Sequence, residues 1–464
     1  MRQNENVFTN IDLPLFFAMI LLMIFGIATV YSVSFNPNHP LLFAPSEKYG
    51  KQFIWLCVSL FVGFLILLIN SEIYRKYAEY LFVFTILMLV LVLFMPPVHG
   101  ARAWLGFGGL GIQPAEFAKI STALLMAKWV AQTNIKLQNM RTVSETVGII
   151  LLPSLLVALQ PDAGTLLVFT SFLFVLYREG ISFDPIVFRL LRLVTRFKFT
   201  STWVGTHFIP LLFFMVILCV FSLYTSESSL KLGENVVVSG TAGMIFAVTG
   251  LALLVLGAVF LWGFKRFRVK NLIILLGSYL FAVLLISSVS IFFNQLAAPH
   301  QKNRIELVLG LKEDPNGSDY NRNRAMASVG SGQFLGKGYK KASVSSVKTN
   351  HVPESETDFI FCPFAEEWGF VGSLVLVLLY LFLLFRIFFI AERQRSVFFR
   401  VYCYCVGMIL FYHFAINIGM NIGLAPVIGI PLPFMSYGGS SLLSFTIMLF
   451  ILLKLDSQRK DVLR

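Results

Sequence analysis

Long apolar segments recur along most of this chain, and they restrict its fold more than any other feature of the sequence. The first, LPLFFAMILLMIFGIATVYSV from Leu13, is long enough to cross a bilayer, which takes about 20 apolar residues in a helix. Only 13% of the 464 residues are charged, about half the share expected of a soluble domain. The sequence therefore predicts an all-α polytopic membrane protein.

About twelve segments satisfy this length criterion. The fifth and sixth are short and poorly separated, so we expect a bundle of about 10–12 transmembrane helices. The expected spans are residues 12–33, 52–70, 78–96, 115–132, 144–160, 163–178, 207–224, 239–263, 271–294, 360–391, 399–424 and 435–455.

The basic residues indicate how these spans are oriented. If the N-terminus is cytoplasmic, most of the 37 Lys and Arg residues fall in cytoplasmic segments or at the adjacent span ends. Both termini are then cytoplasmic, and the polar region 295–359 is one large extracytoplasmic loop. The net charge of +13 reflects this orientation and an attraction to anionic membrane lipid, so nucleic acid is not expected as a partner.

Three ionisable residues lie within or at the edge of expected spans, where a charge is costly and marks a candidate site. Glu116 and Lys119, in QPAEFAK, share one helix face, and their alternative role is a structural ion pair inside the bundle. Asp162, in ALQPDAGTLL, lies at a helix break, and its alternative role is a helix cap.

The sequence lacks the motifs typical of nucleotide sites and metal sites. It contains no P-loop, no GxGxxG that opens a helix after a strand, and no Cys and His spacing typical of a metal site. Chemistry driven by ATP or by a nicotinamide cofactor is therefore not expected.

Six segments, in order along the chain, resemble the signature segments of the SEDS family, which comprises RodA, FtsW and a sporulation relative. They are GARAWLGFGGLGIQPAEFAK from Gly100, QPDAGT from Gln160, PHQKNRIELVLGLKEDPNGSDYN from Pro299, GSGQFLGKG from Gly330, VPESETDFIFCPFAEEWGFVG from Val352 and GIPLPFMSYGGSSLL from Gly429. The pair His300 and Gln301 is more similar to the RodA branch than to FtsW, which tends to have Tyr-Arg there.

The resemblance implies a membrane glycosyltransferase that polymerises lipid II into peptidoglycan glycan strands during cell elongation and shape determination. An FtsW-like septal polymerase is the nearest alternative. A flippase or transporter of lipid-linked precursors would instead need its ionisable residues near the membrane midplane. A non-catalytic scaffold would tolerate the loss of Asp314, the residue to which the resemblance assigns catalysis.

The family implies a ten-helix bundle, whereas the apolar segments give about twelve. No family motif falls between residues 200 and 265, so we expect an inserted helix pair there within a single SEDS-type membrane domain, 1–464. An inserted pair leaves the sidedness of later spans unchanged.

The resemblance implies that the loop 295–359 carries the catalytic carboxylate, and the essential Asp of the family falls on Asp314 in KEDPNGSDY. A sugar hydroxyl is a poor nucleophile near neutral pH, and a carboxylate within hydrogen-bond reach can take its proton. The alternative is that Asp-Pro-Asn-Gly is only a turn, in which the Asp bonds to the backbone. Glu313 and Asp319 are the neighbouring carboxylates most easily mistaken for the base.

In the family's reaction the donor is lipid II, and cleavage of its glycosyl bond leaves negative charge on undecaprenyl pyrophosphate. Cations fixed nearby would stabilise this charge. The candidates are Arg102, Lys119 and Arg304, although Arg102 could anchor a loop and Arg304 could be a solvated charge. Glu116 and Asp162 could hold Lys119 in place or help to bind a divalent cation; the metal requirement stays open. The family's reaction inverts the anomeric carbon, so one base suffices, unlike the paired carboxylates of most glycosidases.

The resemblance also implies partners and a location. They are a class B penicillin-binding protein with transpeptidase activity, the elongation machinery with MreB, membrane lipid and the bacterial cytoplasmic membrane. The glycine-rich segment SYGGSS, Ser436–Ser441, permits close approach of the backbone to a ligand or to neighbouring helices, and close helix packing is the favoured explanation.

Overall fold

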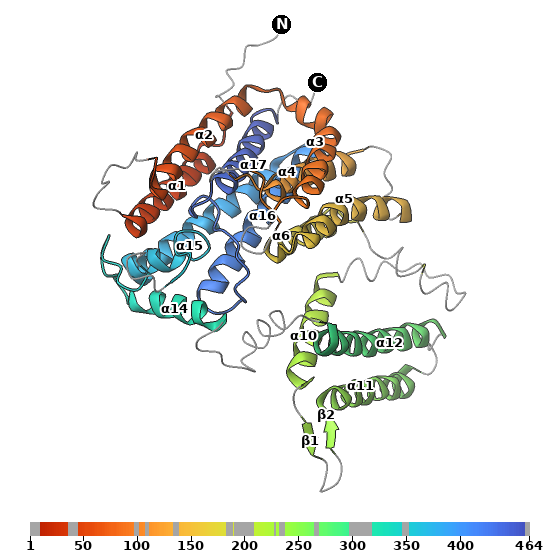
Figure 1. Ribbon diagram of the computed structural model, residues 1–464. Coiled ribbons are helices and arrows are strands. Elements are labelled where there is room, and N and C mark those ends of the chain that lie inside the picture. Colours follow the sequence, from red (N-terminus) through yellow and green to blue (C-terminus); the bar gives the residue numbers. More distant parts are fainter. Residues whose placement is uncertain are drawn as a thin grey trace. The chain divides into compact units, whose positions relative to one another are not determined.

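The structure is a computed structural model, and it describes residues 10–35, 45–96, 102–106, 111–132, 139–181, 189, 208–226, 229–231, 237–263, 269–296, 318–345 and 352–459 (Figure 1). The chain divides into two compact units. The first comprises residues 1–136, 144–179 and 315–464, and the second comprises residues 137–143 and 180–314.

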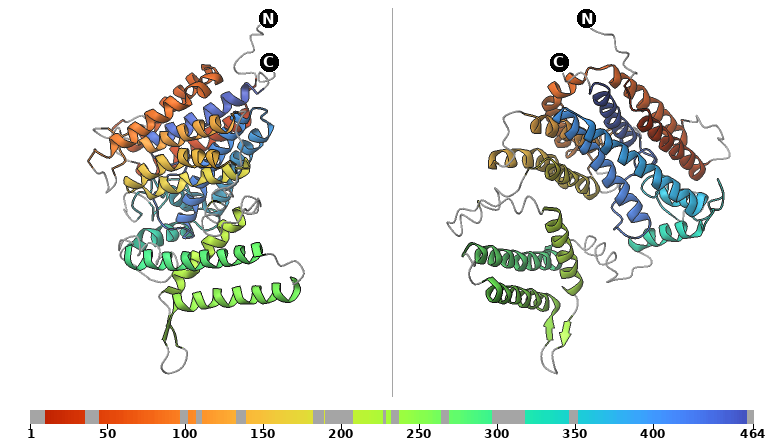
Figure 2. Two further views of the ribbon diagram at one scale, coloured as in Figure 1. Left: turned by 90° about the vertical axis from the view of Figure 1, so that its right-hand side faces the viewer. Right: turned by 180° about the vertical axis from the view of Figure 1, so that it is seen from behind.

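The first unit is a bundle of helices, and Figure 2 shows it from two further sides. Within this bundle, helices from the beginning of the chain pack against helices from its end. Its helices are α1 (Leu13–Ser34), α2 (Lys48–Leu68), α3 (Ser71–Val92), α4 (Pro114–Val130), α5 (Met140–Leu159, from Ser144 on), α6 (Ala163–Phe169), α7 (Ser171–Arg178), α14 (Ser318–Ser331), α15 (Phe361–Arg393), α16 (Val397–Asn421) and α17 (Gly439–Ser457).

The described residues of the second unit form three long helices and a short hairpin. The helices are α10 (Phe208–Ser226), α11 (Gly240–Gly263) and α12 (Val269–Ile291), which continues as a π-helix, η1 (Phe292–Leu296). Strands β1 (Ser229–Lys231) and β2 (Val237–Ser239) pair antiparallel between α10 and α11. Helices α10 and α11 lie within residues 200–265, where the sequence predicts an inserted pair.

Helices α2 and α17 form one of the closest contacts in the bundle, and they run parallel. Trp55 lies against Gly439 near the start of both helices, and Lys454 donates to the carbonyl of Leu67 near their ends, at 2.8 Å. Two parallel spans require an even number of crossings from one to the other. The contact therefore agrees with the order of the expected spans, in which these are the second and the last.

Helix boundaries follow local capping chemistry. The side chain of Asn70 accepts from the amide of Glu72 and caps α3, so this helix begins at Ser71 and includes polar residues that we expected in a loop. α15 is interrupted at Gly369, whose φ of 65° suits glycine. The amides of Phe370 and Val371 donate across the break to the carbonyls of Gln333 and Phe334.

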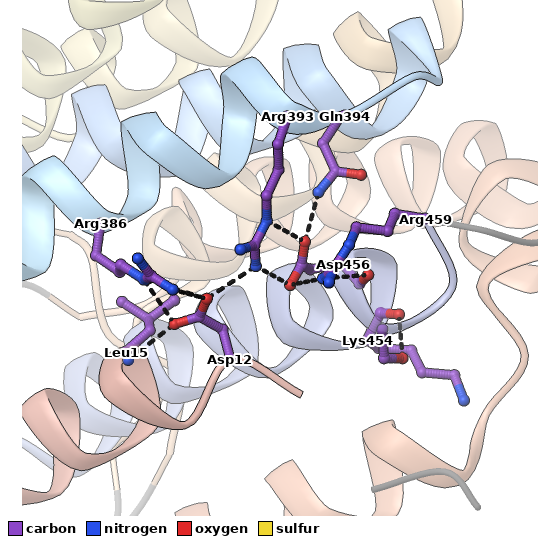
Figure 3. Close-up of polar contacts among 9 residues, drawn as sticks. Asp12, Leu15, Arg386, Arg393, Gln394, Lys454, Asp456 and Arg459 are labelled. Carbon is purple, nitrogen blue, oxygen red and sulfur yellow. Dashed lines mark hydrogen bonds and ion pairs between the residues drawn. The ribbon is translucent and has the colours of Figure 1, made fainter. Parts of the chain in front are cut away.

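A network of ion pairs joins α1, α15 and α17 at one end of the bundle (Figure 3). Asp12, the N-cap of α1, lies 2.7 Å from Arg386 and 2.8 Å from Arg393. Arg393 also binds Asp456, which accepts from Arg459 at 2.9 Å. Because each carboxylate contacts two guanidinium groups, the network holds three distant chain segments together.

The helices account for the predicted membrane fold. Among the described residues, eight helices are long and apolar enough to cross a membrane: α1, α2, α5, α11, α12, α15, α16 and α17. Helices α3, α4, α10 and the α6–α7 pair coincide with the remaining expected spans. The prediction of an all-α polytopic membrane protein is confirmed.

Candidate functional site

Three of the sequence motifs meet at the end of the bundle opposite the ion-pair network. Asp162 is the N-cap of α6, where its carboxylate accepts from the amide of Thr165 at 2.9 Å and from its hydroxyl at 2.8 Å. The side chain of Gln113, which precedes α4, donates to Asp162 at 2.8 Å. The cap role of Asp162 is therefore real, and the same carboxylate also ties the start of α4 to the start of α6.

A second acidic residue, Asp358, lies beside this cap. The segment 352–360 is held against α16 by Asn417, which donates to the carbonyl of Asp358 at 2.8 Å and to that of Ile430 at 2.7 Å. Burial raises the pKa of the Asp358 carboxyl to about 7, and the nearby charges of Glu354 and Asp162 and a hydrogen bond with Glu354 act in the same direction. Asp358 is therefore poised to exchange a proton near neutral pH.

Glu116 and Lys119 form the ion pair that their spacing predicts, and both are buried. The Lys119 ammonium lies 2.9 Å from Glu116 and 2.8 Å from Nε2 of His413, over the ring of Phe445. Ser444 of α17 donates to Glu116 at 3.0 Å. An ammonium group only donates, so Nε2 of His413 accepts, and Nδ1 carries the proton shared with the Pro431 carbonyl. The pair thus connects α4 to α16 and α17.

Arg102 lies apart from this buried pair. Its side chain is exposed, and its guanidinium donates to the carbonyl of Leu93 at 3.2 Å, just beyond the end of α3. Gln160 donates to the carbonyl of Leu89 in the same helix at 3.1 Å. These contacts place Arg102 at the same end of α3 as the break that contains Asp162.

Asp314 and Arg304 lie outside the described residues. Their roles stay predictions from the sequence. Within the loop 295–359 the structure describes residues 295–296, at the end of η1, residues 318–345 and residues 352–359, and these described residues include the helix α14.

Sequence reasoning missed Glu366, which organises much of this loop. Its buried carboxylate accepts from the amides of Ser343, Val344 and Ser345 at 2.8, 3.0 and 2.9 Å, and from Lys337 at 2.6 Å. The signal in the sequence was the pair of acidic residues in the apolar stretch FCPFAEEWGFVG. A buried carboxylate requires this many donors, so the loop 332–345 folds around it.

Its neighbour Glu367 fastens the same loop to α1. One carboxylate oxygen accepts from Ser32 and from the amide of Lys340, while the other is buried and has no hydrogen-bond partner among the described residues. The ammonium of Lys340 lies 4.3 Å from the ring centre of Tyr31 and 4.1 Å from that of Phe35. These contacts attach the loop 332–345 to the end of α1.

The described residues contain no group of three or more His, Cys, Asp or Glu side chains arranged to hold a metal ion. Glu354 and Asp162 lie near Asp358, and their negative charges favour the protonated form of the Asp358 carboxyl.

The fold and the polar end of the bundle define a multi-pass membrane protein with buried ionisable groups in its interior. The family model described as "Cell cycle protein", for FtsW, RodA and SpoVE, matches residues 13–207 and 205–461. The chain belongs to this family.

Its curated relatives carry the names of glycosyltransferases. Peptidoglycan glycosyltransferase MrdB of Escherichia coli K12 is 28% identical over 86% of this chain and 84% of its own length. Peptidoglycan glycosyltransferase RodA of Treponema pallidum is 28% identical over 97% of this chain and 98% of its own length. A probable FtsW of Neisseria gonorrhoeae is 28% identical over 98% of this chain and 86% of its own.

Solved structures share the fold. A chain from a peptidoglycan synthase complex, described as coordinating polymerization and crosslinking, superposes with a TM-score of 0.60 at 24% identity, covering 97% of this chain and 99% of that chain. A mutant of the rod shape determining protein RodA of Thermus thermophilus superposes with a TM-score of 0.56 at 20% identity, covering 97% and 99%.

Proposed function

We propose that this chain is a RodA-type peptidoglycan glycosyltransferase, which polymerises lipid II into glycan strands. The observation that carries the proposal is the family match, which extends from residue 13 to residue 461. The convergence of QPDAGT, VPESETDF and GIPLPF at one end of the bundle supports it. The enzyme acts during cell elongation and shape determination.

Asp314 is the general base in this mechanism. It takes the proton of the acceptor sugar hydroxyl as the new glycosidic bond forms, and the undecaprenyl pyrophosphate of the donor leaves from the opposite face. The α-linked donor gives a β-linked polymer, so the displacement inverts the anomeric carbon in one step. A single essential carboxylate is enough for this chemistry.

Cations stabilise the departing pyrophosphate. Arg102, exposed beyond the end of α3, and Arg304 are the two side chains that we assign to direct contact. Lys119 is enclosed by Glu116, His413 and Phe445, so it supports the site from within the bundle by fixing α4 against α17. Asp162 positions the start of α4 through Gln113, and a divalent cation on the pyrophosphate would add further positive charge.

The protein lies in the bacterial cytoplasmic membrane, with both termini in the cytoplasm and the loop 295–359 outside. This placement follows the distribution of basic residues. The enzyme works with a class B penicillin-binding protein, which crosslinks the new strands, and with the MreB-containing elongation machinery. The fold shared with a chain of a peptidoglycan synthase complex supports the first partner. Residues 200–265 form an insertion outside the catalytic machinery.

The test uses purified full-length chain and lipid II in detergent, with glycan strands resolved by gel electrophoresis. We expect strands from this chain without any added penicillin-binding protein. A parallel assay in liposomes follows fluorescent lipid II from one leaflet to the other. Translocation without polymer would indicate that the protein is a flippase and not a polymerase. The absence of both activities would indicate a non-catalytic scaffold.

A further inference from the structure

Helix α17 begins with three backbone amides that have no acceptor in the part of the chain that the structure describes. The N-cap is Gly438, which has no side chain to accept from them, and no described residue accepts from the amides of Gly439, Ser440 and Ser441. The first amides of any helix lack partners within the helix and carry the positive end of its dipole. The start of a helix of this length is therefore a ready site for an anion.

A buried hydroxyl points to a ligand at the same place. Ser440 is 1% exposed, and its Oγ has no hydrogen-bond partner among the described residues. Side chains of a helix tilt toward its N-terminus, so this hydroxyl lies at the level of the open amides. An unsatisfied buried hydroxyl is energetically costly, and a bound oxygen acceptor would remove that cost.

The neighbouring helix α2 holds this turn in place and adds a cation. Gln52 is buried, accepts from the amide of Gly438 at 3.2 Å and donates to the carbonyl of Ser436 at 3.1 Å. Lys48 is one turn earlier on the same face of α2, and half of its side chain is exposed. Because α2 and α17 run parallel, the positive ends of both helices point toward the same end of the bundle.

The charge balance at this turn favours an anion with more than one negative charge. In the described part of the chain, the acidic side chains near this turn include Glu356, which is paired with Lys48, and Glu116, which is paired with Lys119 and bonded to Ser444 one turn below Ser440. With both acids paired, the open amides leave a net positive potential. A phosphate or pyrophosphate group has the oxygens to satisfy them.

We propose that the start of α17, formed by Gly439, Ser440 and Ser441 with Lys48 at its rim, binds a phosphate or pyrophosphate group. Under the proposed function, on which this identification rests, the occupant is the pyrophosphate of an undecaprenyl-linked substrate. The tight contact of Gly439 with Trp55 explains why glycine stands there, since a Cβ would lie 2.2 Å from the indole ring. The glycine-rich segment SYGGSS thus serves packing and binding together.

The experiment measures binding of radiolabelled undecaprenyl pyrophosphate to the full-length chain in phosphatidylcholine nanodiscs. Ser440→Ala removes the hydroxyl, and we expect the Kd to rise about tenfold, as for one hydrogen bond to a charged group. Ser441→Asp places a negative charge in the first turn, which stabilises the helix but repels phosphate. We expect its Kd to rise more than tenfold, and its Tm shows separately whether a carboxylate at this buried position also destabilises the fold.

Ser457→Ala is the matched control, because Ser457 lies at the other end of α17 and bonds only to the carbonyl of Lys454 among the described residues. Wild-type Kd values in both Ser440→Ala and Ser441→Asp would overturn the site. Competition by inorganic pyrophosphate supports recognition of the phosphate group itself. Competition by phosphatidylglycerol at equal concentration would support a phosphate site that ordinary bilayer lipid occupies.

Binding and turnover are separate readouts, so failure of the site differs from failure of the proposed function. If the wild-type chain binds undecaprenyl pyrophosphate through this turn but forms no strands, the proposed polymerase function is contradicted and the proposed phosphate site is supported. Normal strand formation with unchanged Kd in both variants would contradict the site and keep the polymerase.

Discussion

The buried ion pair of Glu116 and Lys119 links helix α4 to α16 and α17. Taking two charges out of water is costly, and here Ser444 and His413 supply the additional hydrogen bonds that the pair needs. Removal of one partner leaves the other charge buried and uncompensated.

Lys119→Met is therefore expected to destabilise the protein by about 3–5 kcal/mol, whereas a double variant with Glu116→Gln should recover part of that loss. The matched control is Lys128→Met, whose partner Glu79 is more than half exposed and whose ion pair should contribute at most about 1 kcal/mol. Thermal unfolding of the purified proteins in detergent provides the comparison. A Tm for Lys119→Met equal to that of the wild type would rule out a structural role for the pair.

Asp358 predicts a dependence of stability on pH. Its carboxyl titrates near its ordinary pKa of about 3.9 in the unfolded chain and near 7 in the folded one. Between these values the folded state keeps a proton that the unfolded state has lost, so the free energy of unfolding falls as the pH rises through this window.

Asp358→Asn removes this contribution. Its Tm relative to the wild type should therefore increase between about pH 5 and about pH 8. Unfolding of both proteins across this range in one buffer series measures the difference. A difference in Tm that does not change with pH would contradict the raised pKa.

At the scale of elements, apolar periodicity locates the helices but not their polar ends. The spans were predictable because the bilayer sets their length, and the motif residues Glu116, Lys119 and Asp162 were predictable because charges there are costly. The start of α3 at Ser71 depends on a cap, and the break at Gly369 depends on a loop that crosses it. Glu366 and Asp358 gain their importance from contacts between segments far apart in sequence, which no local pattern reveals.

The helices α10 and α11 give the prediction at this scale. Replacement of residues 200–265 by a short polar linker keeps an even number of spans, so strand formation from lipid II should persist at a reduced rate. The comparison is the initial rate of polymerisation by purified variant and wild type. A variant that inserts and folds but forms no strands would place this region in the catalytic or partner-binding machinery.

For the whole molecule, sidedness decides whether the proposed chemistry is feasible, because lipid II polymerisation takes place on the outer face. Lys341, in the loop around Glu366, and Arg395, between α15 and α16, are both exposed and lie in segments predicted to face opposite sides. Their exposure makes them suitable positions for labelling.

In intact cells a membrane-impermeant thiol reagent should label Lys341→Cys above the background of the five native cysteines. Arg395→Cys should be labelled only after lysis. The reverse labelling pattern would show that the topology is inverted. The loop 295–359 would then lie in the cytoplasm, away from lipid II on the outer face.

The most direct test of the central claim is polymerisation of lipid II by Asp314→Asn. Asn keeps the size and turn-forming capacity of Asp but lacks the basic oxygen, and a general base contributes about 10²–10⁴-fold to rate. We predict that the purified variant binds lipid II with wild-type affinity and forms no detectable strands, while Asp319→Asn forms them normally. Strands from Asp314→Asn at the wild-type rate would contradict the assignment of Asp314 as the base.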